Sequence, residues 1–489
     1  MAARLTTYLV VCIVAGTLIA GLIVGAQRDD SDGPVDLIVH NAVVFTGDAS
    51  GKTAEAVAVR GNQVLRVGSN REILRMRRPQ TVAIDAKGAS VLPGFNDAHL
   101  HLVEGGLALD GVDLTGAATI QDAVDRIVAW ADEHPERPWV VGRGWTTFAD
   151  DTRPTRQALD DAVPDRPVYL ASEDGTSAWV NSRALKLAKI ARRAKDPAEG
   201  RIVKDGRGDP TGVLEGDAVR RVASLLPKPT RDDRARAMLT ALAAASRNGI
   251  TSIQASGLEP EDIELLDTAR RGDGLATRIY AALAVRPPTT AAEVARLDAV
   301  LERYPDDPMF KAGAADVDAA SIDADGLNRL VRLLDARGWQ VSLHEGSLDE
   351  GIRSSAAISH AIRSNPAREL ERRHRIESHQ DHVAQVGTRH VVGSDWPYGP
   401  LSPVRVLASL PEQMSLKEAV AGYTAAGAYA SRDEQRKGVL KPSMLADIVV
   451  LSKDIFVLDR SELPTVTVAY TIFDGRVVYP VQRRTTTFP

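Results

Sequence analysis

The stretch LPGFNDAHLHL, residues 92–102, places two histidines at the end of an apolar run. His99 and His101 stand two positions apart, so on an extended strand both imidazoles point to the same side. Two imidazoles that converge at a strand end supply half of a metal site, and a pair of ordinary surface histidines is the alternative. The Pro-Gly step in the run and the carboxylate of Asp97 favour the metal site.

The composition narrows the kind of site that this chain can build. Its 489 residues contain one cysteine, Cys12, which excludes a cysteine-based zinc site and an internal disulfide framework. A metal would therefore be held by His, Asp, Glu or a modified Lys. The formal net charge is −5, so no basic excess points to a nucleic-acid partner. Hydrophobic residues make up 44% of the chain, which excludes disorder over most of its length.

Between residues 91 and 437, short apolar runs alternate with amphipathic helical stretches. RPVYLAS (166–172) and ITSIQAS (250–256) are typical of such runs. Alternating strands and helices predict an α/β fold with a parallel sheet and crossover helices. About eight strands over this length favour a (β/α)8 TIM-like barrel with insertions, in which chemistry gathers at the C-terminal ends of the strands.

The flanks of this segment are β-rich. Residues 33–90 and 438–489 contain short runs of β-branched residues punctuated by Gly and Asn. Each stretch is small for an independent β domain. We therefore expect a single small β-sandwich built from both ends of the chain, which would bring the two ends of the barrel segment together.

The N-terminal residues 1–32 include an uncharged run of 21 residues, Thr6–Ala26, which is long enough to cross about 30 Å of hydrocarbon as a helix. Arg4 precedes this run and acidic residues follow it, which predicts a cytoplasmic N-terminus and extracytoplasmic domains. Two interpretations stay open: a single-pass membrane anchor, or a signal peptide cleaved near Ala26 that releases a secreted or periplasmic protein.

Several longer motifs carry a resemblance to a known family. PGFNDAHLHL (93–102), PTRQALDDAVPDRPVYL (154–170), RIVKDGRGDPTGVLEGDA (201–218) and KGVLKPSMLADIVVLSKD (437–454) resemble the amidohydrolase superfamily, and within it amidohydrolase family 3. N-substituted formamide deformylases belong to that branch. The resemblance extends from about residue 35 to 481 and implies a metal-bearing barrel with the two-piece sandwich.

The resemblance also implies a set of metal ligands at successive strand ends. Besides His99 and His101, it assigns Lys311, His344 and Asp395. The lysine is often carboxylated in relatives so that it bridges two metals, and a strand-end lysine that reaches solvent is the alternative for Lys311. Asp395 would both bind the metal and accept a proton from the attacking water. The implied cofactor is one or two divalent ions, with zinc favoured.

The strand that precedes Asp395 departs from the family pattern. Relatives read His-Arg-Ile-Glu-His, whereas this chain reads HRIESH over residues 374–379, with Ser378 at the expected second histidine. A slip of one residue turns a side chain to the other face of a strand. We expect a bend at the strand end that lets His379 reach the metal, with His374 and His382 as less favoured substitutes.

Two further departures touch the same region. Only residues 379–388 separate this strand from the next, so the seventh barrel unit is predicted to be missing or reduced to a stub. The family motif Asp-Gly-His reads Asp174-Gly175-Thr176. The expected substrate-side residues are Asp174, Trp145 and Glu215.

The leading hypothesis is an extracytoplasmic, metal-dependent amidohydrolase. It would use metal-activated water to cleave a non-peptide C–N bond, amide-like or formamide-like, in a small molecule. The alternative is a degenerate member of the fold with a binding or regulatory role and no catalysis, and a hydrolase of esters or lactones is the third hypothesis. The only other expected partner is the membrane at the N-terminal helix, and the oligomeric state is left open.

Overall fold

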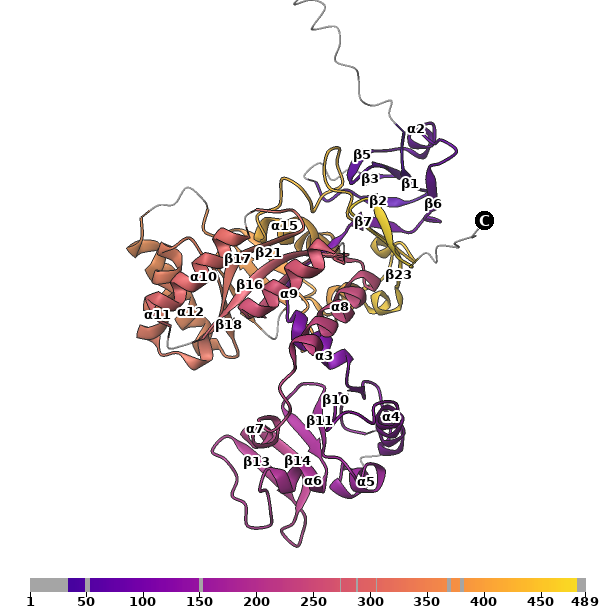
Figure 1. Cartoon of the computed structure of the whole chain (residues 1–489). Coiled ribbons are helices and arrows are strands. Elements are labelled where there is room, and N and C mark those ends of the chain that lie inside the picture. The colour runs from indigo at the N-terminus through magenta and orange to yellow at the C-terminus, as the bar shows by residue number, and fades with distance from the viewer. Residues whose placement is uncertain are drawn as a thin grey trace, which may run out of the picture.

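The computed structural model describes residues 34–48, 53–148, 153–272, 274–286, 289–304, 306–366, 371–378 and 382–481. Within these ranges the chain forms a barrel, a second α/β unit inserted into it, and a β-sandwich. Figure 1 shows the inserted unit below the barrel and the sandwich at the upper right.

The barrel is built on six parallel strands in the order β19-β18-β17-β16-β15-β8. These strands are β8 (Phe95–Leu100), β15 (Ile250–Leu258), β16 (Arg278–Val285), β17 (Phe310–Asp318), β18 (Gln340–Glu345) and β19 (Arg375–Ser378). The helices around them are α3 (Leu102–Leu109), α8 (Arg231–Arg247), α9 (Pro260–Arg271), α10 (Ala291–Arg303), α11 (Ala324–Ala336) and α12 (Leu348–Ser364). Because helices cover the outside of the ring, the strands are largely buried, and their buried residues include polar side chains such as Asn96 and Asp97 of β8.

A hairpin closes most of the gap in the ring. β20 (Val383–Val386) pairs antiparallel with β21 (Arg389–Val392), and in the described part of the chain no helix lies between them. The segment after β21 lies against β8, because Asp395 N donates to His99 O at 2.9 Å and His101 N donates to Trp396 O at 2.8 Å. The ring is nearly closed, which confirms the predicted TIM-like barrel with its seventh unit reduced to β20.

Four short helical segments return the chain from β21 to the sandwich. They are α13 (Pro403–Ser409), α14 (Leu416–Ala421), the π-helix η3 (Gly422–Ala426) and α15 (Gly427–Ala430). η3 and α15 pack against β8 and β21. The polypeptide that follows the hairpin therefore covers the outer face of the closure, where a seventh crossover helix would otherwise lie.

Residues 110–230, between α3 and α8, form the insertion unit. Its six-stranded sheet has the order β13-β14-β12-β11-β10-β9. The strands are β9 (Val112–Asp113), β10 (Val140–Trp145), β11 (Val168–Ser172), β12 (Ser177–Val180), β13 (Gly200–Lys204) and β14 (Pro210–Gly216), and the helices are α4 (Ile120–Glu133), α5 (Arg156–Ala162), α6 (Ser182–Leu187) and α7 (Asp217–Ala223). The unit has core clusters of its own, built around the buried Trp179 and Ala178. The run RPVYLAS is therefore a strand of this second sheet and not of the barrel.

The sandwich joins both ends of the described chain. One sheet contains β5 (Gln63–Gly68), β4 (Ala56–Arg60), β1 (Leu37–His40) and β6 (Val82–Asp85), with α2 (Asn70–Leu74) beside it. The other contains β24 (Arg476–Tyr479), β23 (Val468–Phe473), β22 (Ile448–Leu451), β7 (Ser90–Pro93), β2 (Val43–Phe45) and β3 (Thr53–Ala54). Short 3-10 turns lie at Ala319–Ser321, Ile455–Val457 and Arg460–Thr465. Because β7 leads directly into β8, the sandwich fixes the start of the strand that carries His99.

The predicted N-terminal helix over Thr6–Ala26 lies outside the described residues. Among the residues that the structure does describe, no helix is both long enough and apolar enough to cross a membrane. The single-pass anchor and the extracytoplasmic location expected from the sequence therefore have no support in the structure, and that expectation is corrected here.

Candidate metal centre

The centre begins at the C-terminal end of β8, which delivers His99 and His101. His99 is buried, and its Nδ1 lies 2.9 Å from Ser256 Oγ on β15. This hydrogen bond occupies Nδ1 and leaves Nε2 for the centre. Burial lowers the pKa of His99, which keeps its ring in the neutral form that binds metals.

His344, at the end of β18, brings a third imidazole to the same place. Its ring centroid lies 4.6 Å from that of His99 and 5.9 Å from that of His101. One ring nitrogen from each of the three histidines lies within 4.8 Å of the others. Three residues far apart in sequence converge because parallel strands end at the same rim of the barrel.

Asp395 adds a carboxylate from the loop after β21. Its Oδ1 lies 3.2 Å from His99 Nε2 and 3.3 Å from His101 Nε2. The backbone of Asp395 has φ +53°, in the left-handed region that residues other than glycine rarely adopt. The hydrogen bond from Asp395 N to His99 O stabilises this turn and fixes the carboxylate over the two imidazoles.

Asp97 holds the two ligand-bearing strands together. Its Oδ1 accepts hydrogen bonds from His99 N at 3.2 Å and from Ser394 N at 2.9 Å. Burial raises the pKa of Asp97 to about 7, although these hydrogen bonds oppose the shift. The side chain therefore acts on the backbone behind the site, a role that the sequence analysis did not foresee.

Two further carboxylates at the centre were also not predicted. Asp316, near the end of β17, contacts His344 Nε2 through its Oδ1. Glu377 on β19 lies 3.9 Å from His99 Nδ1 and accepts a hydrogen bond from Arg375. Burial lowers the pKa of His344, but Asp316 and, to a smaller extent, the other nearby carboxylates oppose it and together raise the pKa to about 9.

The donor atoms fit a divalent metal ion. In the described part of the chain, the buried Nε2 atoms of His99 and His101 have no hydrogen-bond partner. Unpaired buried nitrogens cost stability unless an ion or water satisfies them. Imidazole nitrogens together with carboxylate oxygens are a donor set suited to zinc.

Lys311 does not lie at this centre, which corrects the expectation from the sequence. It stands near the start of β17, five residues before Asp316, and at the strand rise this is roughly 16 Å from the C-terminal rim. Its Nζ lies 2.8 Å from Asp433 Oδ1 and 3.3 Å from Asp306 Oδ1. The lysine is thus part of a buried ion-pair network at the opposite end of the barrel.

Of the histidines expected from the sixth strand, His374 does not join the described cluster. His379 lies outside the described residues. His374 Nε2 lies 2.9 Å from Asp335 Oδ1 on α11, and its Nδ1 accepts a hydrogen bond from Val341 N. His374 therefore joins β18 to α11 rather than facing the centre.

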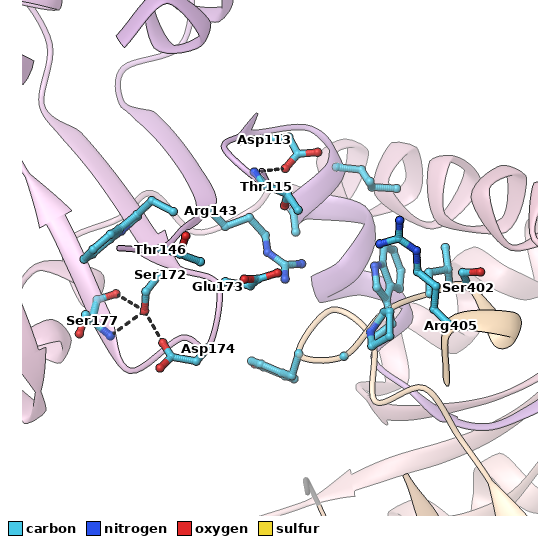
Figure 2. A pocket seen from close by; sticks show the side chains of 18 of the residues that line it. Asp113, Thr115, Arg143, Thr146, Ser172, Glu173, Asp174, Ser177, Ser402 and Arg405 are labelled. Carbon is cyan, nitrogen blue, oxygen red and sulfur yellow. Dashed lines mark hydrogen bonds between the residues drawn. The ribbon is translucent and has the colours of Figure 1, made fainter. Parts of the chain in front are cut away.

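A cavity of about 1070 Å³ lies beside the centre, between the insertion unit and the loop after β21. Trp396 and Tyr398 line it, and the ring centroid of Tyr398 lies 5.5 Å from that of His101. Figure 2 shows Arg143 and Glu173 from the insertion unit on one side, with Arg405 from the barrel on the other. The cavity thus mixes aromatic walls with charges of both signs.

The three substrate-side residues expected from the sequence are placed differently. Trp145 and Asp174 line the cavity. Glu215 does not: it lies on β14, and its carboxylate binds Arg201 of β13 at 2.8 Å. The expectation for Glu215 is corrected, because its strand is farther from the barrel in the order of the insertion sheet.

Comparison with known proteins places these observations in a family. The profile of the amidohydrolase family matches residues 82–385 and 384–479. Over 219 residues the chain is 32% identical to the protein LONG AFTER FAR-RED 3 of Arabidopsis thaliana, covering 45% of this chain and 38% of that protein. Over 204 residues it is 33% identical to the N-substituted formamide deformylase of Arthrobacter pascens, covering 41% of this chain and 37% of that enzyme. In both cases the match spans less than two fifths of the relative.

A solved structure shares the architecture. The crystal structure of an uncharacterized metal-dependent hydrolase from Pyrococcus furiosus superposes with a TM-score of 0.62. The two chains are 19% identical, and the match covers 86% of this chain and 99% of the other. At this level of identity the likeness shows the fold alone.

Proposed function

Because this chain belongs to the amidohydrolase family, we propose that it is a metal-dependent hydrolase that cleaves a non-peptide C–N bond of the amide or formamide type in a small molecule. One observation carries the proposal: three imidazoles and the Asp395 carboxylate converge at the barrel rim, next to a cavity large enough for a small-molecule substrate. The similarity to a formamide deformylase supports the bond type.

His99, His101, His344 and Asp395 would hold the ion, and zinc suits their donor atoms. When bound, such an ion supplies a Lewis acid that polarises a substrate carbonyl and lowers the pKa of water. In the tautomer that binds a metal through Nε2, His99 Nδ1 carries the hydrogen and donates it to Ser256 Oγ, which keeps the lone pair of Nε2 directed at the centre.

Asp395 is positioned to transfer a proton from the attacking water to the leaving nitrogen. Its Oδ1 lies between two imidazoles at the rim, where the carboxylate would accept a proton from the attacking water and return it to the leaving nitrogen. The aromatic rings of Trp396 and Tyr398 would orient the substrate and limit the access of solvent to the reacting carbonyl.

The test is a hydrolysis screen with the zinc-loaded protein on a panel of N-formyl and N-acyl amines, with esters and lactones alongside. We expect release of amine from at least one formamide or amide, and we expect loss of that activity in Asp395→Asn. Asp318→Asn is the matched control, because Asp318 is an exposed carboxylate on β17. Retained activity in Asp395→Asn would contradict the role of that carboxylate.

A second function keeps support from one observation, the reduction of the seventh barrel unit to a hairpin. A barrel altered beside its rim could bind a ligand without transforming it. A zinc-loaded protein that binds amides in calorimetry but releases no product would favour this binding function over the hydrolase. Preference for esters or lactones in the same panel would overturn the proposed bond type.

A further inference from the structure

Asp316 brings a second carboxylate to the candidate metal centre. Its Oδ1 contacts Nε2 of His344, the neighbouring strand's ligand candidate. Its Oδ2 lies 3.7 Å from the point where a Cβ on Gly257 would stand, and His101 Nδ1 lies 3.7 Å from the same point. The carboxylate therefore lies beside His344, and a Cβ on Gly257 of β15 would be in van der Waals range of both Asp316 and His101.

The charges of the centre balance with one divalent cation. Asp316 and Asp395 are both buried, and Glu377 is already paired with Arg375. Without a metal, a protonated His344 offsets the charge of Asp316 alone, whereas a divalent cation among neutral imidazoles would offset both carboxylates. Three imidazoles and two carboxylates are also donors suited to zinc without any modified side chain.

We propose that Asp316 is itself a metal ligand and that the centre holds a single divalent ion, an inference that rests on the proposed metal-dependent function. A two-ion centre of the kind expected from the sequence needs a bridging group, and Lys311 was the residue assigned to bridge. In the structure Lys311 binds Asp433 at the other end of β17. Asp316 takes the place at the rim and supplies its charge without carboxylation.

A competing role for Asp316 is purely positional. A carboxylate that hydrogen-bonds to a ligating histidine orients the ring and typically changes metal affinity by roughly 10–100-fold when it is removed. Such a residue lies outside the coordination sphere, so its removal leaves the number of ligands on the ion unchanged. The two roles are therefore separated by a spectroscopic count of ligands, in addition to the affinity.

The experiment uses the purified chain, stripped of metal and titrated with zinc and with cobalt(II), without any substrate. Elemental analysis gives ions per chain, competition with a chromogenic chelator gives the zinc affinity, and the visible spectrum of cobalt(II) reports coordination number. Asp316→Asn is compared with Asp318→Asn, which removes an exposed carboxylate from the same strand. Lys311→Arg keeps a cation beside Asp433 but cannot be carboxylated.

We expect one ion per wild-type chain, a weak cobalt(II) spectrum typical of five or more ligands, and a loss of zinc affinity in Asp316→Asn beyond the roughly 100-fold of an orienting neighbour. The cobalt(II) spectrum of Asp316→Asn should change, while Asp318→Asn and Lys311→Arg should behave as wild type. Two ions per chain, or an unchanged spectrum in Asp316→Asn, would overturn the inference and leave the proposed function standing.

The wild-type protein decides the question even if Asp316→Asn does not fold, as judged by circular dichroism. A strong absorption typical of four-coordinate cobalt(II) in the wild type would show that the ion does not have five protein ligands. Asp316 could then not bind it in addition to the three histidines and Asp395. A folded wild-type chain that takes up no metal would overturn the proposed function itself, and this inference with it.

Discussion

Replacing Gly393 by alanine would force β21 away from β8 directly behind the candidate metal centre. A Cβ on Gly393 would stand 2.7 Å from His99 N and 2.8 Å from His99 Cβ. Non-bonded heavy atoms need about 3.5 Å, so the two strands must separate by about 0.8 Å. Overpacking of this kind costs about 1–3 kcal/mol of folding free energy.

The same displacement would move Asp395, two residues further along, away from the imidazoles of β8. Asp395 Oδ1 lies 3.2 Å from His99 Nε2 and 3.3 Å from His101 Nε2. Metal sites tolerate errors of only about 0.2 Å in ligand distance. We therefore expect Gly393→Ala to lower zinc affinity by roughly 10–100-fold, the range seen when support of the ligands is lost.

The assay is a zinc competition titration, combined with thermal unfolding of the metal-free protein. Gly346→Ala is the matched control, because it lies two residues after His344 and its Cβ would meet only Glu350 Oε2, at 3.5 Å. If Gly393→Ala binds zinc and unfolds as the wild type does, then β21 is not held against β8 as described, and the reasoning is refuted.

Three other changes test the account away from this strand pair. Asp447→Ala removes the acceptor of two hydrogen bonds from buried Arg278, at 2.7 and 2.9 Å, which link the barrel to the sandwich. The substitution should lower the free energy of unfolding, measured by denaturant titration, by about 3–5 kcal/mol. An unchanged midpoint would show that this link is dispensable. Burial lowers the pKa of Lys437 from 10.5 to about 8. Between these pH values the unfolded chain binds more protons than the folded chain, so raising the pH should stabilise the folded wild type. The gain relative to Lys437→Met should reach about 3 kcal/mol. A stability difference between these two proteins that does not vary from pH 7 to 10 would contradict the depressed pKa. Arg405→Ala should raise KM for a hydrolysed amide without changing kcat or the unfolding temperature, since Arg405 is exposed on the cavity wall; an unaltered KM would separate this cavity from substrate binding.

The barrel and the first three imidazoles were accessible to sequence reasoning for a physical reason. Strand-forming runs that end in His or Asp place those side chains at one rim whenever the sheet is parallel. His99, His101 and His344 each lie at the end of such a run, whereas Asp395 lies in the loop after β21, and the family resemblance was what assigned His344 and Asp395. Their placement at one rim agrees with that expectation, while metal binding by them remains a proposal.

The sequence did not show that Asp316, and not Lys311, is the residue of its strand that lies at the rim of the barrel. The run FKAGAADVD carries both residues on one strand, and which of them reaches the rim depends on where β17 begins relative to β16 and β18. That register depends on the pairing with both neighbouring strands as well as on the strand's own hydrophobic pattern, and FKAGAADVD has only a weak alternation to fix it. Asp316 lies two residues before the end of β17, whereas Lys311 is the second residue of the strand.

The sequence predicted insertions in the barrel but not that RPVYLAS belongs to one of them, for a related reason. RPVYLAS is as apolar as any barrel strand, because a buried strand has the same composition in either sheet. What separates the two sheets is strand pairing: β11 pairs with β10 and β12, whereas β8 pairs with β15 across the whole insertion. Pairing between residues this far apart in the sequence does not change local composition, so local composition cannot predict to which sheet a strand belongs.

The central claim, that this barrel holds a divalent ion among its rim histidines, is tested most directly by anomalous diffraction at the zinc edge from crystals of the zinc-loaded protein. One strong peak is expected, enclosed by His99, His101, His344 and Asp395. A well-ordered rim without a peak, or zinc bound only elsewhere on the chain, would contradict it.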